Sequence, residues 1–127
     1  MNRTIAKTAA TYLQRVLEIL SSPDRYTTDS QAVMADGRQC LPNDLRAVKW
    51  SLTGALWRAA GPSMSARALR GHDLAASLML SQAQSSSPMT SGRTLAVAEG
   101  AASWSRARQW AQEALAEAQL GSSDPGR

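Results

Sequence analysis

The chain has 127 residues, of which 43% are hydrophobic, and it has a formal net charge of +4 with a pI near 10.0. One histidine and one cysteine exclude an intramolecular disulfide and the usual zinc ligand sets. No stretch approaches the roughly 18 apolar residues that a transmembrane helix needs. We therefore expect one cytoplasmic helical domain over residues 1–120, without a cofactor or membrane contact, and a disordered tail over 121–127.

The first predicted helix covers residues 3–21. Its apolar face follows from seven residues at helical spacing: Ile5, Ala9, Tyr12, Leu13, Val16, Leu17 and Leu20. The run Ser21 to Asp24 ends this helix. Residues 24–42 are expected to be irregular, with strand character at 26–28 and 32–34. Asp36-Gly37 is a turn signal, from which Arg38 to Leu41 could pair back as a short hairpin packed on the helices.

Residues 42–62 form the clearest predicted helix, with Asn43 or Asp44 as its N-cap and Gly61-Pro62 as its stop. Its apolar stripe is Val48, Leu52, Ala55, Leu56 and Ala59, broadened by Trp50 and Trp57. The two tryptophans fit either core packing or the lining of a ligand pocket or interface. Gly54 between them predicts the close approach of a second helix.

The segment Ala47-Val48-Lys49-Trp50-Ser51-Leu52-Thr53-Gly54-Ala55-Leu56, preceded by Asp36-Gly37-Arg38, resembles a family of small bacterial and phage proteins of unknown function. In that family a D-G-R turn precedes a helix that reads roughly A-V-R-W-C-L-x-G-A-L. The resemblance covers about residues 10–60 and implies an α-helical fold without a known activity. Ser51 replaces the family's cysteine, and Ser103-Trp104-Ser105 lacks the acidic group of the family's W-N-D. Both departures weaken any catalytic role for those positions.

Further helices follow in the C-terminal half. Ser63 or Ser65 caps a third helical region, which Gly71-His72-Asp73 is expected to split in two. The serine-rich residues 81–93 predict a long flexible loop, and Thr94 opens a short helix. Ser103 caps a final helix ending at Gly121, whose expected inner face is Trp104, Ala107, Ala111, Ala114, Leu115 and Ala118. The expected fold is thus an all-α bundle of five or six helices with a possible hairpin between the first two.

The sequence offers little chemistry. Asp24, Asp29, Asp36 and Asp44 lack the spacing of a calcium loop and suit turns and caps better. A Cys40–His72 dyad would need a geometry that the sequence does not supply. A helix-turn-helix around Gly71 would have a second helix without basic residues, which argues against base reading. No catalytic, cofactor or metal residue is therefore predicted, and an enzyme is the least favoured class.

Arg106 and Arg108 lie in the first turn of the last helix, where the backbone already presents positive partial charge. Together with Arg93 they predict a basic patch that faces an acidic protein surface or a phosphate backbone, although solvent-facing side chains explain them equally simply. We expect a non-enzymatic binding protein that acts through protein–protein contacts. Its association with phage or mobile elements follows from the resemblance alone. The alternative is a nucleic-acid-associated protein whose scattered arginines contact phosphates.

Overall fold

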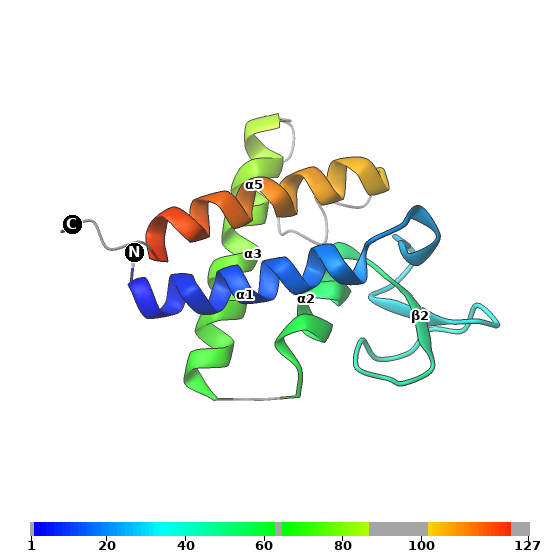
Figure 1. Ribbon diagram of the computed structural model, residues 1–127. Helices are drawn as coiled ribbons and strands as arrows, with labels where there is room; N and C mark the ends of the chain where they lie inside the picture. The colour runs from blue at the N-terminus through cyan, green and yellow to red at the C-terminus, as the bar shows by residue number, and fades with distance from the viewer. Residues whose placement is uncertain (1, 63–64, 87–101, 123–127) are drawn as a thin grey trace.

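The computed structural model describes residues 2–62, 65–86 and 102–122 (Figure 1). These residues form seven elements in chain order: α1 (Arg3–Ile19), the 3-10 helix η1 (Pro23–Arg25), β1 (Ala32–Met34), β2 (Ala47–Trp50), α2 (Leu52–Ala60), α3 (Ala66–Ser86) and α5 (Trp104–Ser122). The expected helical fold with a small antiparallel sheet is confirmed. The described residues contain four α-helices, fewer than the five or six expected, and the short helix expected from Thr94 lies outside them.

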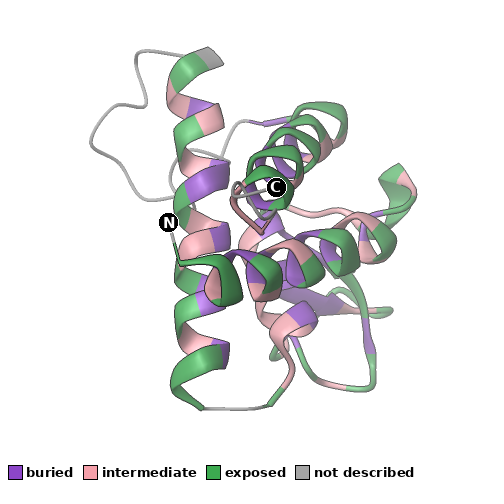
Figure 2. Ribbon diagram, turned by 60° about the vertical axis from the view of Figure 1, so that its left-hand side comes forward, coloured by how far each residue is buried: buried purple, intermediate pink, exposed green. Residues whose placement is uncertain are grey.

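The helices pack around α1, which contacts α2, α3 and α5. Figure 1 shows α1 and α5 running side by side in opposite directions while α3 crosses both. Buried residues line the sides of the helices that face one another, and exposed residues cover the outer sides (Figure 2). The largest fully buried side chains are Leu13, Val16, Leu20, Leu52, Leu56 and Met79. The first helix therefore has the buried face that its apolar spacing predicts.

The helix predicted over residues 42–62 is the main error of the sequence-based fold. Residues 47–50 form β2, and α2 begins only at Leu52, where the Ser51 side chain accepts a hydrogen bond from the Gly54 amide at 2.9 Å. Val48 is consequently exposed on the strand, and Trp50 belongs to the sheet. The predicted stop is correct, because Gly61 caps the helix with a φ of 75°.

The hairpin is larger than expected. The predicted turn at Asp36-Gly37 lets residues 38–40 pair back on β1, with the Cys40 amide donating to the Ala32 carbonyl at 3.0 Å. The other edge of β1 pairs with β2 in antiparallel register, which places Ala32 opposite Trp50 and Val33 opposite Lys49. Residues 23–50 form a lobe at the end of α1 opposite to its N-terminus (Figure 1). We call this segment the β lobe.

The third helix is continuous from Ala66 to Ser86, so Gly71 does not split it and residues 81–86 are helical rather than a loop. A Cβ at Gly71 would lie 2.4 Å from Cγ2 of Thr8, which shows that this glycine allows α1 to approach α3 closely. Ser65 caps α3, as one of the two predicted serines. The remainder of the predicted loop, residues 87–93, lies outside the described residues.

The last helix begins after Ser103, whose hydroxyl accepts from the Arg106 amide at 3.2 Å, as predicted. It extends to Ser122, one residue beyond the predicted stop at Gly121. All four alanines predicted for its inner face are buried: Ala107, Ala111, Ala114 and Ala118. Trp110 is also buried and was not predicted. Residues 123–127 of the expected tail lie outside the described residues.

Candidate functional site

Large apolar side chains are exposed on one loop of the β lobe. The described residues expose four large hydrophobic side chains, and three of them lie between residues 41 and 48: Leu41 (76% exposed), Leu45 (93%) and Val48 (42%). The fourth, Leu120, lies at the end of α5. Single exposed apolar residues are ordinary on protein surfaces, and three on one short segment make this segment the candidate site. We call residues 41–48, which end with the first two residues of β2, the apolar loop.

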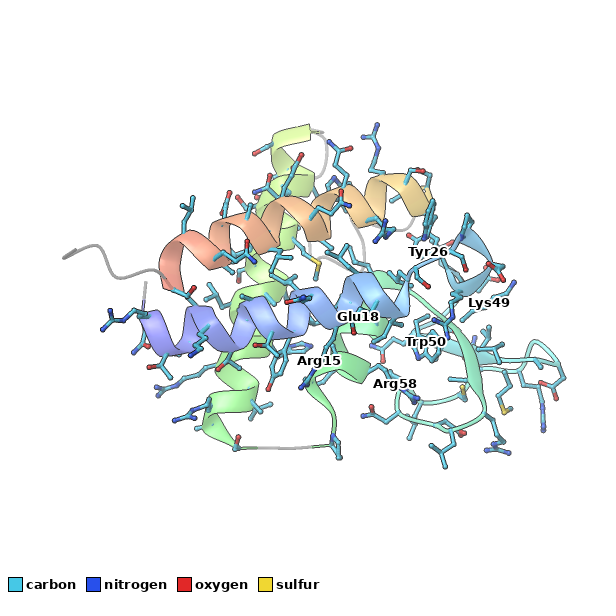
Figure 3. All side chains as sticks on the ribbon, viewed as in Figure 1. Arg15, Glu18, Tyr26, Lys49, Trp50 and Arg58 are labelled. Carbon is cyan, nitrogen blue, oxygen red and sulfur yellow. The ribbon has the colours of Figure 1, made fainter. Side chains whose placement is uncertain are left out.

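Two side chains, from β2 and α2, fix the backbone of the apolar loop by hydrogen bonds. The indole Nε1 of Trp50 donates to the Pro42 carbonyl at 3.0 Å. The Arg58 Nη1 donates to the same carbonyl at 3.3 Å and to the Asp44 carbonyl at 3.2 Å. Figure 3 shows Trp50 and Arg58 beside each other where β2 meets α2. The guanidinium of Arg58 also lies 5.5 Å from the centre of a Trp50 ring, a cation–π contact that holds both groups.

The loop is further ordered by its own polar residues. The Asp44 amide donates to the Leu41 carbonyl, and the Ala47 amide donates to the Asp44 carbonyl. The Asp44 carboxylate accepts from the amide and the guanidinium of Arg46. These hydrogen bonds from Arg46 lower the pKa of Asp44 to about 2, so the turn keeps its charge pair at any physiological pH. An aspartate that closes a local turn competes with helix formation, which explains why Asp44 does not cap a helix.

The polar groups around the apolar loop are mixed in sign. Arg46 pairs with Asp44, and Arg38 pairs with Asp36 across 2.7 Å on the neighbouring hairpin turn. Lys49 is exposed on β2 and points away from the bundle (Figure 3). An apolar centre with a charged rim is the usual composition of a protein–protein interface. Exposed pairs of this kind contribute little to stability and leave the rim available for contacts.

The residues predicted to form a basic partner-binding patch have different surroundings. Arg93 lies outside the described residues. Arg106 is exposed on the first turn of α5. Arg108 is half-buried, its Nη2 donates to the Leu17 carbonyl at 3.5 Å, and its guanidinium lies 5.5 Å from a Trp104 ring centre. Arg108 thus contacts the negative C-terminal end of α1. This contact within the fold explains a basic residue near the start of α5.

Two other arginines also bind carbonyls inside the fold. Arg15 on α1 donates to the Ala59 carbonyl at the end of α2, across 2.9 Å, and Arg58 holds the apolar loop. Lysine presents a compact charge, whereas the branched guanidinium reaches several carbonyls at once. Some of the arginines therefore bind helix ends and turns, and the net charge overstates the basic surface left for a partner.

The chemistry-bearing residues do not assemble into a reactive centre in the described part of the chain. Burial raises the pKa of the Cys40 thiol, which disfavours the nucleophilic thiolate. His72 is buried in α3 and stacks on Trp57 with ring centres 3.8 Å apart. Among the described residues, neither of its ring nitrogens has a hydrogen-bond partner. Across residues 2–62, 65–86 and 102–122, no group of three potential metal ligands occurs.

Comparison of the chain with protein-family models, curated proteins and solved structures gave no match. The resemblance to the D-G-R family therefore has no independent support. None of the described helices combines the length and hydropathy needed to cross a lipid bilayer.

Sequence reasoning missed the apolar loop because it assigned residues 43–50 to a buried helix. One signal was present in the sequence. Leu41 and Leu45 flank Pro42-Asn43-Asp44, a cluster of turn-forming residues, and leucines on either side of such a turn have no regular element to bury them. The exposure of Val48 follows from the pairing of β2 with β1, a strand distant in sequence, and no local pattern reveals it.

Proposed function

We propose that the protein is a non-enzymatic binding protein and that the apolar loop is the surface that contacts its protein partner. The observation that supports this proposal most is the exposure of Leu41, Leu45 and Val48 on a segment whose backbone is held by Trp50 and Arg58. Exposed leucines on a fixed backbone lose little conformational entropy when they are buried by a partner. The partner would offer an apolar depression for the leucines and polar groups for the mixed rim.

A structural role explains these leucines less well. Leucines that stabilise a fold are buried, as Leu13, Leu52 and Leu56 are. Leu41 and Leu45 remain in water although Trp50, beneath the same loop, is buried. Burying one leucine side chain from water gains about 1.5–3 kcal/mol, so two leucines and a valine provide a useful fraction of a binding free energy. The fold itself does not bury these side chains, so a second molecule that buries them would gain this free energy.

The test is affinity capture from lysate of the source cell with three forms of the tagged chain. The first is the wild type, the second is Leu41→Glu with Leu45→Glu, and the third is Leu120→Glu. Leu120 has the same exposed fraction as Leu41, 76%, but lies on α5, so its variant controls for the effect of a glutamate at an exposed leucine. All captures are made with and without nuclease, which separates protein partners from proteins that are bound through nucleic acid.

The proposal predicts a protein that the wild type and the Leu120→Glu variant retain after nuclease treatment and that the double variant loses. The binding constant of that protein, purified, should weaken in the double variant while all three forms unfold at similar temperatures. Equal retention by all three forms would show that the apolar loop is not the interface. Loss from both glutamate variants alike would attribute capture to nonspecific apolar contacts and would also defeat the proposal.

A further inference from the structure

One outer edge of the sheet in the β lobe is open in the described part of the chain. At the β2 side, Tyr26 bridges Trp50 and the Thr27 amide donates to the Trp50 carbonyl, so that edge is partly covered. On the other side, residues 38–41 follow the hairpin turn, and no described segment pairs with their outer edge. In Figure 1 this hairpin projects away from the helices, so a second molecule can approach it. An open sheet edge offers unpaired backbone groups to another strand.

The open backbone groups at this edge belong to Gln39. The Arg38 carbonyl accepts from the Met34 amide at 2.8 Å, and the Cys40 amide donates to the Ala32 carbonyl, so the residues on either side of Gln39 use groups that point toward β1. Backbone groups of successive residues point to opposite sides of a strand. The N–H and C=O of Gln39 therefore both point away from β1, and neither has a hydrogen-bond partner among the described residues.

The charges around this edge favour a second copy of the chain as the molecule that covers it. Residues 32–48 are neutral, because their two acidic side chains balance their two basic ones, whereas the whole chain carries +4. Net charge of one sign opposes the association of two copies, and it opposes it least through a neutral face. Both signs are present in the pair Asp36–Arg38, so the acidic group of one copy can face the basic group of the other.

We infer that two copies of the chain pair through these edges, antiparallel about a two-fold axis, with Gln39 opposite Gln39. This register satisfies both open groups in both copies, because each N–H donates to the C=O of the other copy. It also places Leu41 of one copy opposite Gly37 of the other, where a Cβ would meet no described atom within 4 Å, so the exposed leucine has room. The inference rests on the proposed function in one respect, since it names a second copy as the protein that covers Leu41 of the apolar loop.

The experiment is sedimentation equilibrium of the wild type, Gln39→Pro and Gln39→Ala at protein concentrations up to about 1 mM, because small interfaces form weak complexes. Proline removes the outward N–H and is tolerated on an edge where that N–H faces solvent. Alanine keeps the N–H and is the matched control. Melting temperatures establish that all forms are folded. Gln39→Ala should dimerise like the wild type, and Gln39→Pro should weaken dimerisation roughly tenfold or more, since each dimer loses two hydrogen bonds.

A second measurement tests the register without the proline variant. Facing Cα atoms in a hydrogen-bonded antiparallel pair lie about 5.5 Å apart, which a disulfide can span. Gln39→Cys in a Cys40→Ser background should therefore form a disulfide-linked dimer with oxidised glutathione. Ser105→Cys in the same background places an exposed thiol on α5 and should remain mainly monomeric.

A wild type that is monomeric at every concentration, equal dimerisation of Gln39→Pro and Gln39→Ala, or equal cross-linking of the two cysteine variants would each overturn the inference. Capture of a different protein, lost in the Leu41→Glu, Leu45→Glu variant, would in that case still support the proposed function. A dimer that Gln39→Pro breaks, together with equal capture by the wild type and the double glutamate variant, would support the pairing and defeat only the proposed function.

Discussion

The indole Nε1 of Trp104, on the first turn of α5, donates a hydrogen bond to the backbone carbonyl of Leu20, across 2.8 Å. Leu20 caps the C-terminal end of α1, where carbonyls have no partner within the helix. Nearby, the Tyr26 hydroxyl donates to the Ala102 carbonyl at 3.2 Å. These two side chains join the start of α5 to the end of α1 and to the β lobe, and thereby close the antiparallel pair of helices.

Removal of the indole hydrogen bond is expected to destabilise the fold. Trp104→Phe keeps an aromatic ring but leaves the Leu20 carbonyl without its donor, which should lower the free energy of unfolding by about 1–3 kcal/mol. Urea denaturation of the variant and of the wild type measures this difference. Identical midpoints would show that water replaces the indole without cost.

Two helical glycines should respond differently to alanine. A Cβ at Gly54 would lie 1.8 Å from the Gln31 carbonyl oxygen, a backbone atom, so Gly54→Ala should displace the β lobe and destabilise strongly. At Gly71 the nearest atom belongs to the Thr8 side chain, so Gly71→Ala should destabilise less, and Thr8→Ala should partly rescue it. Thermal unfolding of the two single variants and the double variant gives the ranking. A stabilised Gly71→Ala would mean that helix propensity outweighs the close approach.

These glycines also show what the sequence could and could not predict. The amphipathic pattern of residues 3–21, the serine caps at Ser65 and Ser103 and the stop at Gly61 are local, and the structure confirms them. Gly54 was expected to contact a second helix, but its neighbour is the backbone of Gln31. Gly71 was expected to break a helix, but it allows two helices to approach. The roles of both glycines are set by residues distant in sequence, which composition and spacing do not reveal.

Contacts between distant residues also decide the structure of residues 47–60 and of the candidate site, and the sequence does not reveal them. Val48, Leu52, Ala55 and Leu56 are spaced as on one apolar helix face, so periodicity alone favours a helix. Pairing of β2 with β1 divides the segment at Ser51 instead. The exposure of Leu45 appears only when distant segments are brought together. Arg106 and Arg108 were proposed from their position in a helix, which says nothing about Leu17 as a neighbour of Arg108.

Buried and exposed leucines should differ sharply in their effect on stability. Leu52→Ala and Leu56→Ala each remove a fully buried side chain and should cost about 2–5 kcal/mol of unfolding free energy. Leu41→Ala and Leu45→Ala remove exposed side chains and should change it by less than about 0.5 kcal/mol. Chemical denaturation of the four variants makes the comparison. A large loss in Leu45→Ala would assign that leucine to the core rather than to a partner surface.

Stability is expected to fall as the pH is lowered from 7.5 to 5. Burial lowers the pKa of His72 below its usual value, and the Asp73 carboxylate, 3.7 Å from Nδ1, opposes this only in part. As the pH falls, His72 therefore takes up a proton in the unfolded chain before it does so in the folded chain, at a pH of about 6.5. Each further decrease in pH then favours the unfolded chain. The aspartates with lowered pKa values, Asp24 and Asp44, lose their contribution only at more acidic pH.

Melting temperatures at intervals between pH 7.5 and 5 measure this effect in the wild type and in His72→Phe. The variant keeps a ring against Trp57 and should lose most of the slope in this range. A slope that is unchanged in His72→Phe would assign the pH dependence to other groups.

Amide hydrogen exchange across residues 41–48, with and without the captured partner, tests the proposed function most directly. In the free chain, the amides of Asp44, Arg46 and Ala47 donate to atoms of the loop itself, so they should exchange slowly for a surface segment, and Arg58→Met should accelerate them. Addition of the partner should then slow exchange over the whole apolar loop. Rapid exchange of these amides in the free chain, or protection by the partner at any other part of the chain, would contradict a fixed apolar loop as the binding surface.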